Sequence, residues 1–533
     1  MSEIRLSRRV LLAAFLLISA LYLLQGFYYA RVLVPAQDGI NYLLAGAKAV
    51  TGEIGLYDDR LVGNRLPLPF YVLGLSQAMA GGPSLRAARW MNIGFGLLTL
   101  WLTAGLARRL AGDLAGILAA LFLATQGVIV AYYAFEGYLA FAAFCVIAGF
   151  FAFAEGDSPT RRLIGMALIG LLFFVRSNLW PLIPLVLGYS LWRARGMRER
   201  ALLLAAVTVP PVAFFAWNST HLKLLAYVPV ARRFVAPLGY VSALTIDDRE
   251  TLALGVQLLA VAKIVRRYEF WALAAALLAV IVLWRMSKRQ ALAWATRPVI
   301  ALACLLAASI GALFVMYPWN YRWIGIYFVP YAPLAALLLG VSYAGLLADT
   351  VPRSWQRRLL ILALVAVLAP PLYYARNPLL PIGEALARDP YAAAHRAAEH
   401  LRRAVPGRPK VFLYGLGETY YLSGLPTTYL QQAYMPDHFA KVPIDDRVAH
   451  RSGFVTPGEM RYWLTEDADY AVIDQRLVDA VKPRFGDTEK EMFRLLALHF
   501  DLIDTVDDYP FNTYLVYRRK GAARLDPHLR SGR

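Results

Sequence analysis

Cysteine and charge are both scarce in this sequence, and each scarcity excludes a class of protein. Only two cysteines occur among the 533 residues, and both, Cys145 and Cys304, lie inside apolar runs. A disulfide framework and a thiolate metal site are therefore not expected, and the two side chains are interpreted as small core residues. Charged residues make up 17% of the chain and hydrophobic residues 59%, and the mean hydropathy is +0.48. This balance is typical of a polytopic membrane protein rather than of a soluble domain.

Motifs for several common chemistries are also missing from the sequence. The histidines show no zinc-binding spacing, since His395 and His400 lie five residues apart and the others are scattered. No convincing Gly-rich phosphate loop is present, so nothing indicates a nucleotide-sugar site. Ser423 lies in the segment GETYYLSG, which lacks the Gly-x-Ser-x-Gly pattern around a serine nucleophile.

Positive charge, in contrast, is abundant. The net charge is +19, from 55 Lys and Arg residues against 36 Asp and Glu residues. In a soluble protein this excess would favour nucleic-acid binding. Here much of the excess falls in short loops between apolar runs, where the positive-inside rule explains it better. We therefore expect contact with membrane lipids and no nucleic-acid partner.

Apolar runs long enough to span or nearly span a bilayer recur along the first two thirds of the chain. They lie at about 10–30, 90–107, 114–133, 138–154, 163–175, 178–192, 201–217, 269–284, 298–316, 323–347 and 359–374. These runs predict an all-α polytopic membrane bundle of about eleven transmembrane helices. The two short runs on either side of Arg176 contain Pro181 and Pro184 as well, which predicts two thin spans or one bent hairpin.

The loops also predict an orientation. The first apolar run follows Arg5, Arg8 and Arg9, is long for a signal-peptide core and has no convincing cleavage site after it. We interpret it as a retained helix with a cytoplasmic N-terminus. An odd number of helices then places the C-terminus on the other face, which is the periplasm if the host is Gram-negative. The expected location is a bacterial inner membrane.

The segment 375–533 differs in kind from the transmembrane domain at 1–374. It has more charge and no spanning run, and its strand-like pieces KVFLYG (410–415), YAVID (470–474) and NTYLVYRRK (512–520) occur among helical stretches. This pattern predicts a C-terminal soluble α/β domain on the extracytoplasmic side.

Two acidic residues lie next to predicted helix ends on the extracytoplasmic side. Asp38 follows the first helix, early in the first outer loop (31–89), and an amphipathic stretch comes after it. Glu136 lies in the very short turn YAFEGY between the third and fourth helices. A short turn keeps its side chains close to the bundle, so both acids could face one cavity. The alternative for each acid is a solvated loop residue.

Three arginines are candidates for binding a phosphate group: Arg65 in the first loop, Arg176 between two short helices, and Arg322 in the turn YPWNYRW. A guanidinium inside or beside a membrane usually has a partner, which favours a functional Arg176. Arg322 is flanked by aromatic residues, so an interfacial aromatic belt with an anchoring arginine explains it equally well.

Together these features resemble the GT-C membrane glycosyltransferases. The resemblance includes Asp38 with Tyr42 four residues on, the Pro-rich re-entry at Pro67 and Pro69, and the following segment RAARWMNIGFGLLTLWLTAGLARRLAGDLAGILAALFLA. The nearest branch is the one with the protein O-mannosyltransferases and the lipid A aminoarabinose transferases. The segment YRWIGIYFVPYAPLAALLLG and the C-terminal domain are also similar to parts of these enzymes.

The resemblance implies transfer of a sugar from a polyprenyl-phosphate carrier to an extracytoplasmic lipid, glycan or protein hydroxyl. It implies that Asp38 matches the first-loop carboxylate at the reaction centre, as base or as metal ligand, and that Glu136 matches the second-loop acid. A divalent metal cation held by Asp38 and Glu136 is then the expected cofactor. Many members have an acidic pair where this chain has Asp38-Gly39, and Asp is common where it has Glu136.

General chemistry agrees with such a transfer. The incoming hydroxyl needs a base for its proton, and the departing phosphate needs positive charge from an arginine or a divalent cation. Two other classes remain open as alternatives. One is a lipid-linked polysaccharide polymerase or ligase, and the other is a transporter or flippase, which would tend to show repeated halves and polar residues at the membrane midplane.

Overall fold

The computed structural model describes residues 7–33, 37–53, 66–154, 158–217, 303–312, 324–349, 389–426, 455–508 and 512–521, apart from residues 310 and 416, together with a few isolated positions. The described residues pack as two units. The first draws on residues 1–33, 89–217 and 250–382, and the second on residues 34–88, 218–249 and 383–533. The predicted apolar runs at 269–284, 298–316 and 359–374 lie wholly or largely outside the described residues.

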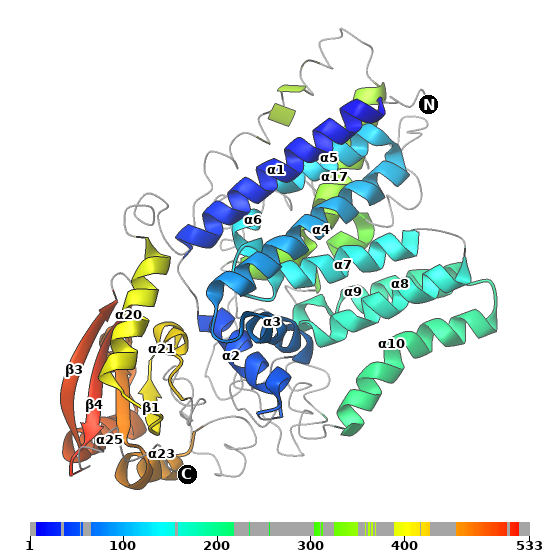
Figure 1. Ribbon diagram of the computed structural model, residues 1–533. Coiled ribbons are helices and arrows are strands. Elements are labelled where there is room, and N and C mark those ends of the chain that lie inside the picture. Colours follow the sequence, from blue (N-terminus) through cyan, green and yellow to red (C-terminus); the bar gives the residue numbers. More distant parts are fainter. Residues whose placement is uncertain are drawn as a thin grey trace. The chain divides into compact units, whose positions relative to one another are not determined.

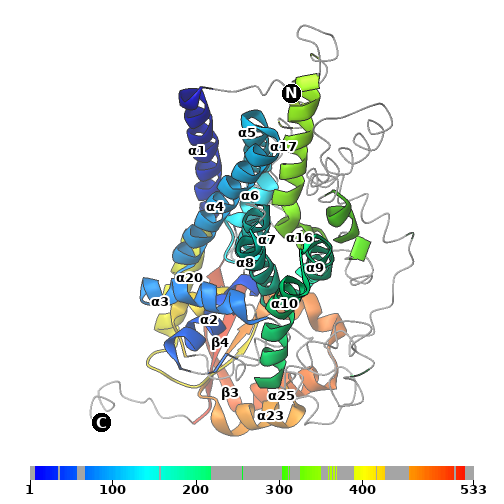
Figure 2. The ribbon, with the colours of Figure 1, turned by 90° about the vertical axis from the view of Figure 1, so that its right-hand side faces the viewer.

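The first unit is helical. Its elements are α1 (Arg8–Val32), α4 (Leu85–Ala111, whose first turn falls in the second unit), α5 (Asp113–Thr125), α6 (Gly127–Tyr133), α7 (Leu139–Ala154), α8 (Pro159–Leu171), η1 (Leu172–Phe174), η2 (Ser177–Leu179), α9 (Leu182–Arg193), α10 (Met197–Trp217), α16 (Ile324–Phe328), η5 (Val329–Tyr331) and α17 (Ala332–Asp349). Helix α17 packs along α5, and α8 packs between α7 and α10 (Figures 1 and 2). Every predicted apolar run before residue 217 coincides with helix in this unit.

Within the described part of the chain, four helices are long and apolar enough to cross a membrane: Arg8–Val32, Leu85–Ala111, Met197–Ala216 and Ile326–Gly345. The pair α5 and α6 makes a fifth if it forms one span, with a bend of 75° at Gln126. The predicted helical bundle is confirmed in kind, whereas the count of about eleven spans is not confirmed. Helices α8 and α9 have only 13 and 12 residues, since the chain becomes extended at Arg176 and two 3₁₀ turns replace continuous helix.

Two helices from the first loop belong to the second unit. Helix α2 (Gln37–Thr51) carries Asp38 near its start, and α3 begins at Pro67 and ends before Gly81, which has the left-handed conformation that favours glycine (α3, Pro67–Ala80). The two helices touch backbone to backbone. A Cβ atom added at Gly46 would overlap the carbonyl of Phe70, and one added at Gly74 would overlap the backbone of Gly46. Only glycine permits this approach.

The C-terminal part of the second unit is an α/β sandwich. Its elements are α20 (Pro390–Ala404), β1 (Val411–Tyr414), α21 (Glu418–Ser423), α23 (Pro457–Tyr462), the π-helical turn Trp463–Asp467, β2 (Tyr470–Asp474), α24 (Gln475–Val481), η8 (Lys482–Arg484), α25 (Asp487–His499), β3 (Phe500–Asp508) and β4 (Asn512–Arg519). The sheet has the order β1-β2-β4-β3, in which β1 and β2 are parallel and the other pairs antiparallel. The three predicted strands are confirmed, and β3 is an additional strand.

Helices cover both faces of this sheet. On one face, Phe412 and Tyr414 of β1 pack with Met492 and Leu496 of α25. On the other face, residues that alternate with these, such as Val411 and Leu413, pack with Leu401 of α20 and Tyr420 of α21. Because both faces of the sheet are buried, β1 and β2 are continuous apolar runs, which is why the sequence reveals them.

The close contact of α2 and α3 predicts that alanine destabilises the protein at Gly74 but not at a glycine without close neighbours. We expect Gly74→Ala to lower the unfolding temperature of the detergent-solubilised protein, because the added methyl group forces two backbones apart at a cost of about 1–3 kcal/mol. Gly94→Ala in α4 is the matched control, since a Cβ atom at Gly94 has no neighbour within 4 Å. Equal unfolding temperatures for the two variants would contradict the interpretation.

Candidate functional site

Glu136 lies in the turn that joins α6 to α7, and it is fully buried. Helix α6 ends at Tyr133 and α7 begins at Leu139, so only five residues form the connection. This burial excludes the alternative that Glu136 is a solvated turn residue. A buried carboxylate is stable only when it is paired and hydrogen-bonded.

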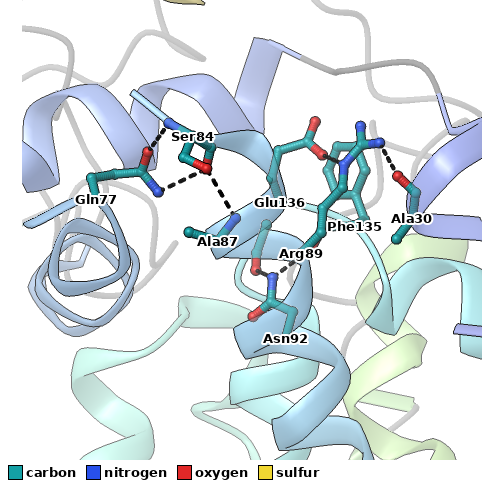
Figure 3. A network of polar contacts seen from close by, with 9 residues as sticks. Ala30, Gln77, Ser84, Ala87, Arg89, Asn92, Phe135 and Glu136 are labelled. Carbon is teal, nitrogen blue, oxygen red and sulfur yellow. Dashed lines mark hydrogen bonds and ion pairs between the residues drawn. The ribbon is translucent and has the colours of Figure 1, made fainter. Parts of the chain in front are cut away.

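The partner of Glu136 is Arg89, in the first turns of α4. The Nε atom of Arg89 donates to Oε2 of Glu136 at 2.7 Å, and neither side chain is exposed. Its Nη1 atom donates to the carbonyl oxygen of Ala30 at 2.6 Å (Figure 3). Ala30 belongs to the last turn of α1, where carbonyl groups lack helical partners, so the guanidinium also caps that helix. Arg89 Nη2 has no hydrogen-bond partner within the described part of the chain.

Asn92 holds the same turn by its backbone. It lies three residues after Arg89, on the same side of α4. Its side-chain amide donates to the carbonyl oxygens of Phe135 and Gly137, the two residues that flank Glu136 (Figure 3). The side chain and the two neighbouring carbonyls of Glu136 are therefore all fixed by one face of α4.

Arg176 lies beside this turn. Its guanidinium carbon is 4.5 Å from the ring centroid of Tyr138, in cation–π geometry. The chain around Arg176 is fixed by Asn178. The side-chain amide of Asn178 donates to the backbone carbonyl oxygen of Tyr327 at 2.9 Å. The backbone carbonyl oxygen of Asn178 accepts from the hydroxyl of Tyr331 at 2.7 Å. The structure thus places one predicted site residue, Arg176, against a tyrosine only two positions after another, Glu136.

The structure describes less of the other predicted site residues. Asp38 lies in the first turn of α2, in the second unit, and its side chain is outside the described part of the structure. Arg65 and Arg322 lie outside the described residues altogether. Their roles, and those of Asp38, Glu136 and Arg176, stay predictions.

Sequence reasoning missed Arg89 and Asn92. A weak signal was available, because both polar residues occur in the segment RAARWMN at the start of an apolar helix. Arg or Asn near a membrane-facing helix end usually has a partner. Nothing in the sequence pairs Arg89 with a residue 47 positions away, however, and only the packing of α4 against the α6–α7 turn does so.

The second unit has a polar junction of its own, centred on Gln77 of α3. Its Oε1 atom accepts from the backbone nitrogen of Ser84 at 2.7 Å and from the hydroxyl of Tyr421 at 2.8 Å. Tyr421 belongs to α21, which also packs against α2. Burial raises the pKa of the Tyr421 phenol above its ordinary value, so the hydroxyl remains protonated and able to donate. The C-terminal domain therefore holds the first-loop helices, including the one that carries Asp38.

Metal ligands do not gather among the described residues, where no group of three His, Cys, Asp or Glu side chains could hold an ion. Glu136 in particular does not fit the predicted ligand role. Its carboxylate lies against the Arg89 guanidinium, and a divalent cation would have to bind beside that positive charge. We derive no step through a metal.

No protein-family model matches this sequence, and no curated protein sequence matches it. Solved structures do match. ArnT from Cupriavidus metallidurans bound to undecaprenyl phosphate is 16% identical, with a TM-score of 0.56 over 94% of this chain and 97% of that one. The apo state of the same protein is 17% identical, with a TM-score of 0.56 and the same coverage.

An oligosaccharyltransferase from Archaeoglobus fulgidus, tethered with an acceptor peptide, is 12% identical and covers 95% of this chain and 74% of that one. Its TM-score of 0.49 is too low to carry a conclusion. The similarity to ArnT establishes the fold alone: the chain shares the fold of ArnT, and its described residues form a helical bundle and a small α/β domain.

The junction at Gln77 can be tested through stability. We expect Tyr421→Phe to lower the unfolding temperature, because it removes a buried hydrogen bond that contributes about 0.5–1.5 kcal/mol. Limited proteolysis should also cleave the first loop faster in this variant. Tyr462→Phe is the matched control, since Tyr462 is an exposed tyrosine of the same domain. A variant at position 421 that behaves like the control would show that the junction contributes nothing measurable.

Proposed function

We propose that the protein is an integral membrane glycosyltransferase that moves a sugar from a polyprenyl-phosphate carrier to an extracytoplasmic hydroxyl group. The observation that supports this most directly is the shared fold with ArnT bound to undecaprenyl phosphate, over 94% of the chain. The acceptor is a lipid, glycan or protein. The apolar helices agree with a carrier that never leaves the bilayer.

The proposed reaction is a single displacement. The acceptor oxygen forms a bond to the anomeric carbon of the sugar, and the bond from that carbon to the phosphate oxygen breaks. The hydroxyl proton passes to a carboxylate, and the carrier leaves as polyprenyl phosphate. We assign the base to Asp38, because the sequence predicts a carboxylate early in the first outer loop, on the same side of the membrane as the acceptor.

We propose that the guanidinium of Arg176 binds the departing phosphate. Two features support this choice. The Tyr138 ring restrains one face of the guanidinium, and the half-buried location strengthens its electrostatic interactions relative to bulk water. Arg65 and Arg322 remain further candidates for the same phosphate. Asn178 fixes the backbone two residues beyond Arg176, which supports a preorganised donor rather than a mobile side chain.

We also propose that the N-terminus is cytoplasmic and the C-terminal domain periplasmic, in a bacterial inner membrane. The distribution of arginine between the loops supports this orientation. A carrier sugar on the outer leaflet and an acceptor outside the cytoplasm would then meet on the same side.

The function is tested with the purified full-length chain in nanodiscs. A panel of undecaprenyl-phosphate sugars is supplied together with membrane lipid and glycan acceptors, and the release of undecaprenyl phosphate is measured. We expect release that depends on an acceptor. Turnover of nucleotide sugars in the absence of the lipid carrier would contradict the proposal.

Asp38→Asn tests the base. We expect the transfer rate to fall about 100-fold or more, because the amide cannot accept the hydroxyl proton. Donor binding should change little. Glu53→Gln is the control, since Glu53 lies after α2 in a surface ion pair with Lys48 and is 59% exposed. Full activity of Asp38→Asn at unchanged expression would remove Asp38 from the mechanism.

Arg176→Gln tests the phosphate contact. We expect the rate to fall about 100-fold, together with weaker binding of undecaprenyl phosphate. The rate and the affinity of Arg176→Lys should lie between those of the wild type and of Arg176→Gln, because lysine keeps the charge but lacks the planar guanidinium that stacks on Tyr138. Equal affinity for undecaprenyl phosphate in all three proteins would exclude Arg176 from the donor site.

A further inference from the structure

We propose that Arg89 is a positioning residue for this reaction, and that Glu136 serves as its buried counterion rather than as a base or a metal ligand. The proposal rests on the proposed function for its kinetic readout. Its structural basis is the set of contacts that α4 makes with the α6–α7 turn and with the end of α1.

The first step of the argument is geometric. The α6–α7 turn is held at three points from one face of α4: the Glu136 carboxylate by Arg89, and the carbonyls of Phe135 and Gly137 by Asn92. Arg89 also binds the Ala30 carbonyl. One side chain therefore links three separate segments of the first unit.

The second step concerns charge. Both members of the pair are completely buried, and Glu136 is the only acidic partner that Arg89 has among the described residues. Removing one member of a buried pair leaves an uncompensated charge, whereas removing both can be nearly neutral. A carboxylate that neutralises a buried guanidinium also cannot take up a proton without leaving that guanidinium uncompensated. General-base chemistry at Glu136 would therefore disrupt the structure that holds it.

The third step connects the turn to the proposed chemistry. Two residues after Glu136 comes Tyr138, the ring on which the Arg176 guanidinium lies at 4.5 Å. A shift of the turn moves this ring and, with it, the Arg176 guanidinium that is proposed to bind the departing phosphate. Arg89 thus acts on the reaction through Glu136, the turn and Tyr138, without touching the substrate.

The test is a double-mutant cycle of Arg89→Gln, Glu136→Gln and the variant with both changes. We expect each single variant to lose about 100-fold in transfer rate with weaker donor binding, as for a misplaced catalytic group. The double variant should recover about tenfold or more over either single variant, because it buries no unpaired charge. Arg89→Lys should retain more activity than Arg89→Gln.

A matched control lies at the other end of α4, where the helix meets α5. Arg108 and Asp113 also form an ion pair, with 2.6 Å between Nε and Oδ1, but the arginine side chain is 53% exposed. We expect Arg108→Gln and Asp113→Asn to change the rate less than about twofold, since exposed pairs contribute little.

Two results would overturn the proposal. If Glu136→Gln and the double variant are equally inactive while Arg89→Gln is active, Glu136 is itself a reacting group or a metal ligand. If all three variants match the wild type, the pair positions nothing. Hydrogen–deuterium exchange of the peptide that covers 134–138 gives a readout without activity: exchange should rise in both single variants and fall back in the double variant.

The two failures are distinguishable. If the wild-type chain transfers no sugar from any donor, the proposed function fails, while the exchange pattern still decides whether Arg89 holds the turn. If the wild type is active but exchange of the turn is unchanged in Arg89→Gln, the positioning role fails and the proposed function stands.

Discussion

A buried guanidinium imposes the strictest constraint on the first unit. Arg89 is fully enclosed near the start of an apolar helix, where its charge is destabilising unless hydrogen bonds and a counter-charge surround it. Glu136 supplies the counter-charge, and the Ala30 carbonyl supplies a further acceptor. The end of α1, the start of α4 and the α6–α7 turn must therefore stay together, since separating any of them leaves a buried charge or donor unpaired.

Under the proposed function, this constraint also affects Arg176. The turn that Arg89 holds continues directly into Tyr138, on which Arg176 lies, and the broken helix around Arg176 is fixed in turn by Asn178. Each residue in this chain of contacts binds at least one partner that lies far away in the sequence. A site that must stabilise a departing phosphate benefits from such rigidity, because preorganised donors need not rearrange during the reaction.

The second unit uses a different means of fixing the helix that carries Asp38. Helices α2 and α3 touch backbone to backbone at Gly46 and Gly74, and Tyr421 of the C-terminal domain binds Gln77 of α3. The C-terminal domain thus helps to hold helices α2 and α3 of the first loop in place. Asp38, in the first turn of α2, is carried by this supported helix.

The resemblance to the GT-C glycosyltransferases anticipated the fold that the chain shares with ArnT. The helical class and the strands β1, β2 and β4 followed from the sequence by itself. These depend on local patterns: apolar runs of spanning length, and short apolar runs buried on both faces of a sheet. It did not reveal β3, whose segment FDLIDTVDD has four aspartates, a residue depleted in strands. Only the tertiary structure decided the environment of Glu136, because its pairing with Arg89 depends on how two helices pack and not on any pattern along the chain.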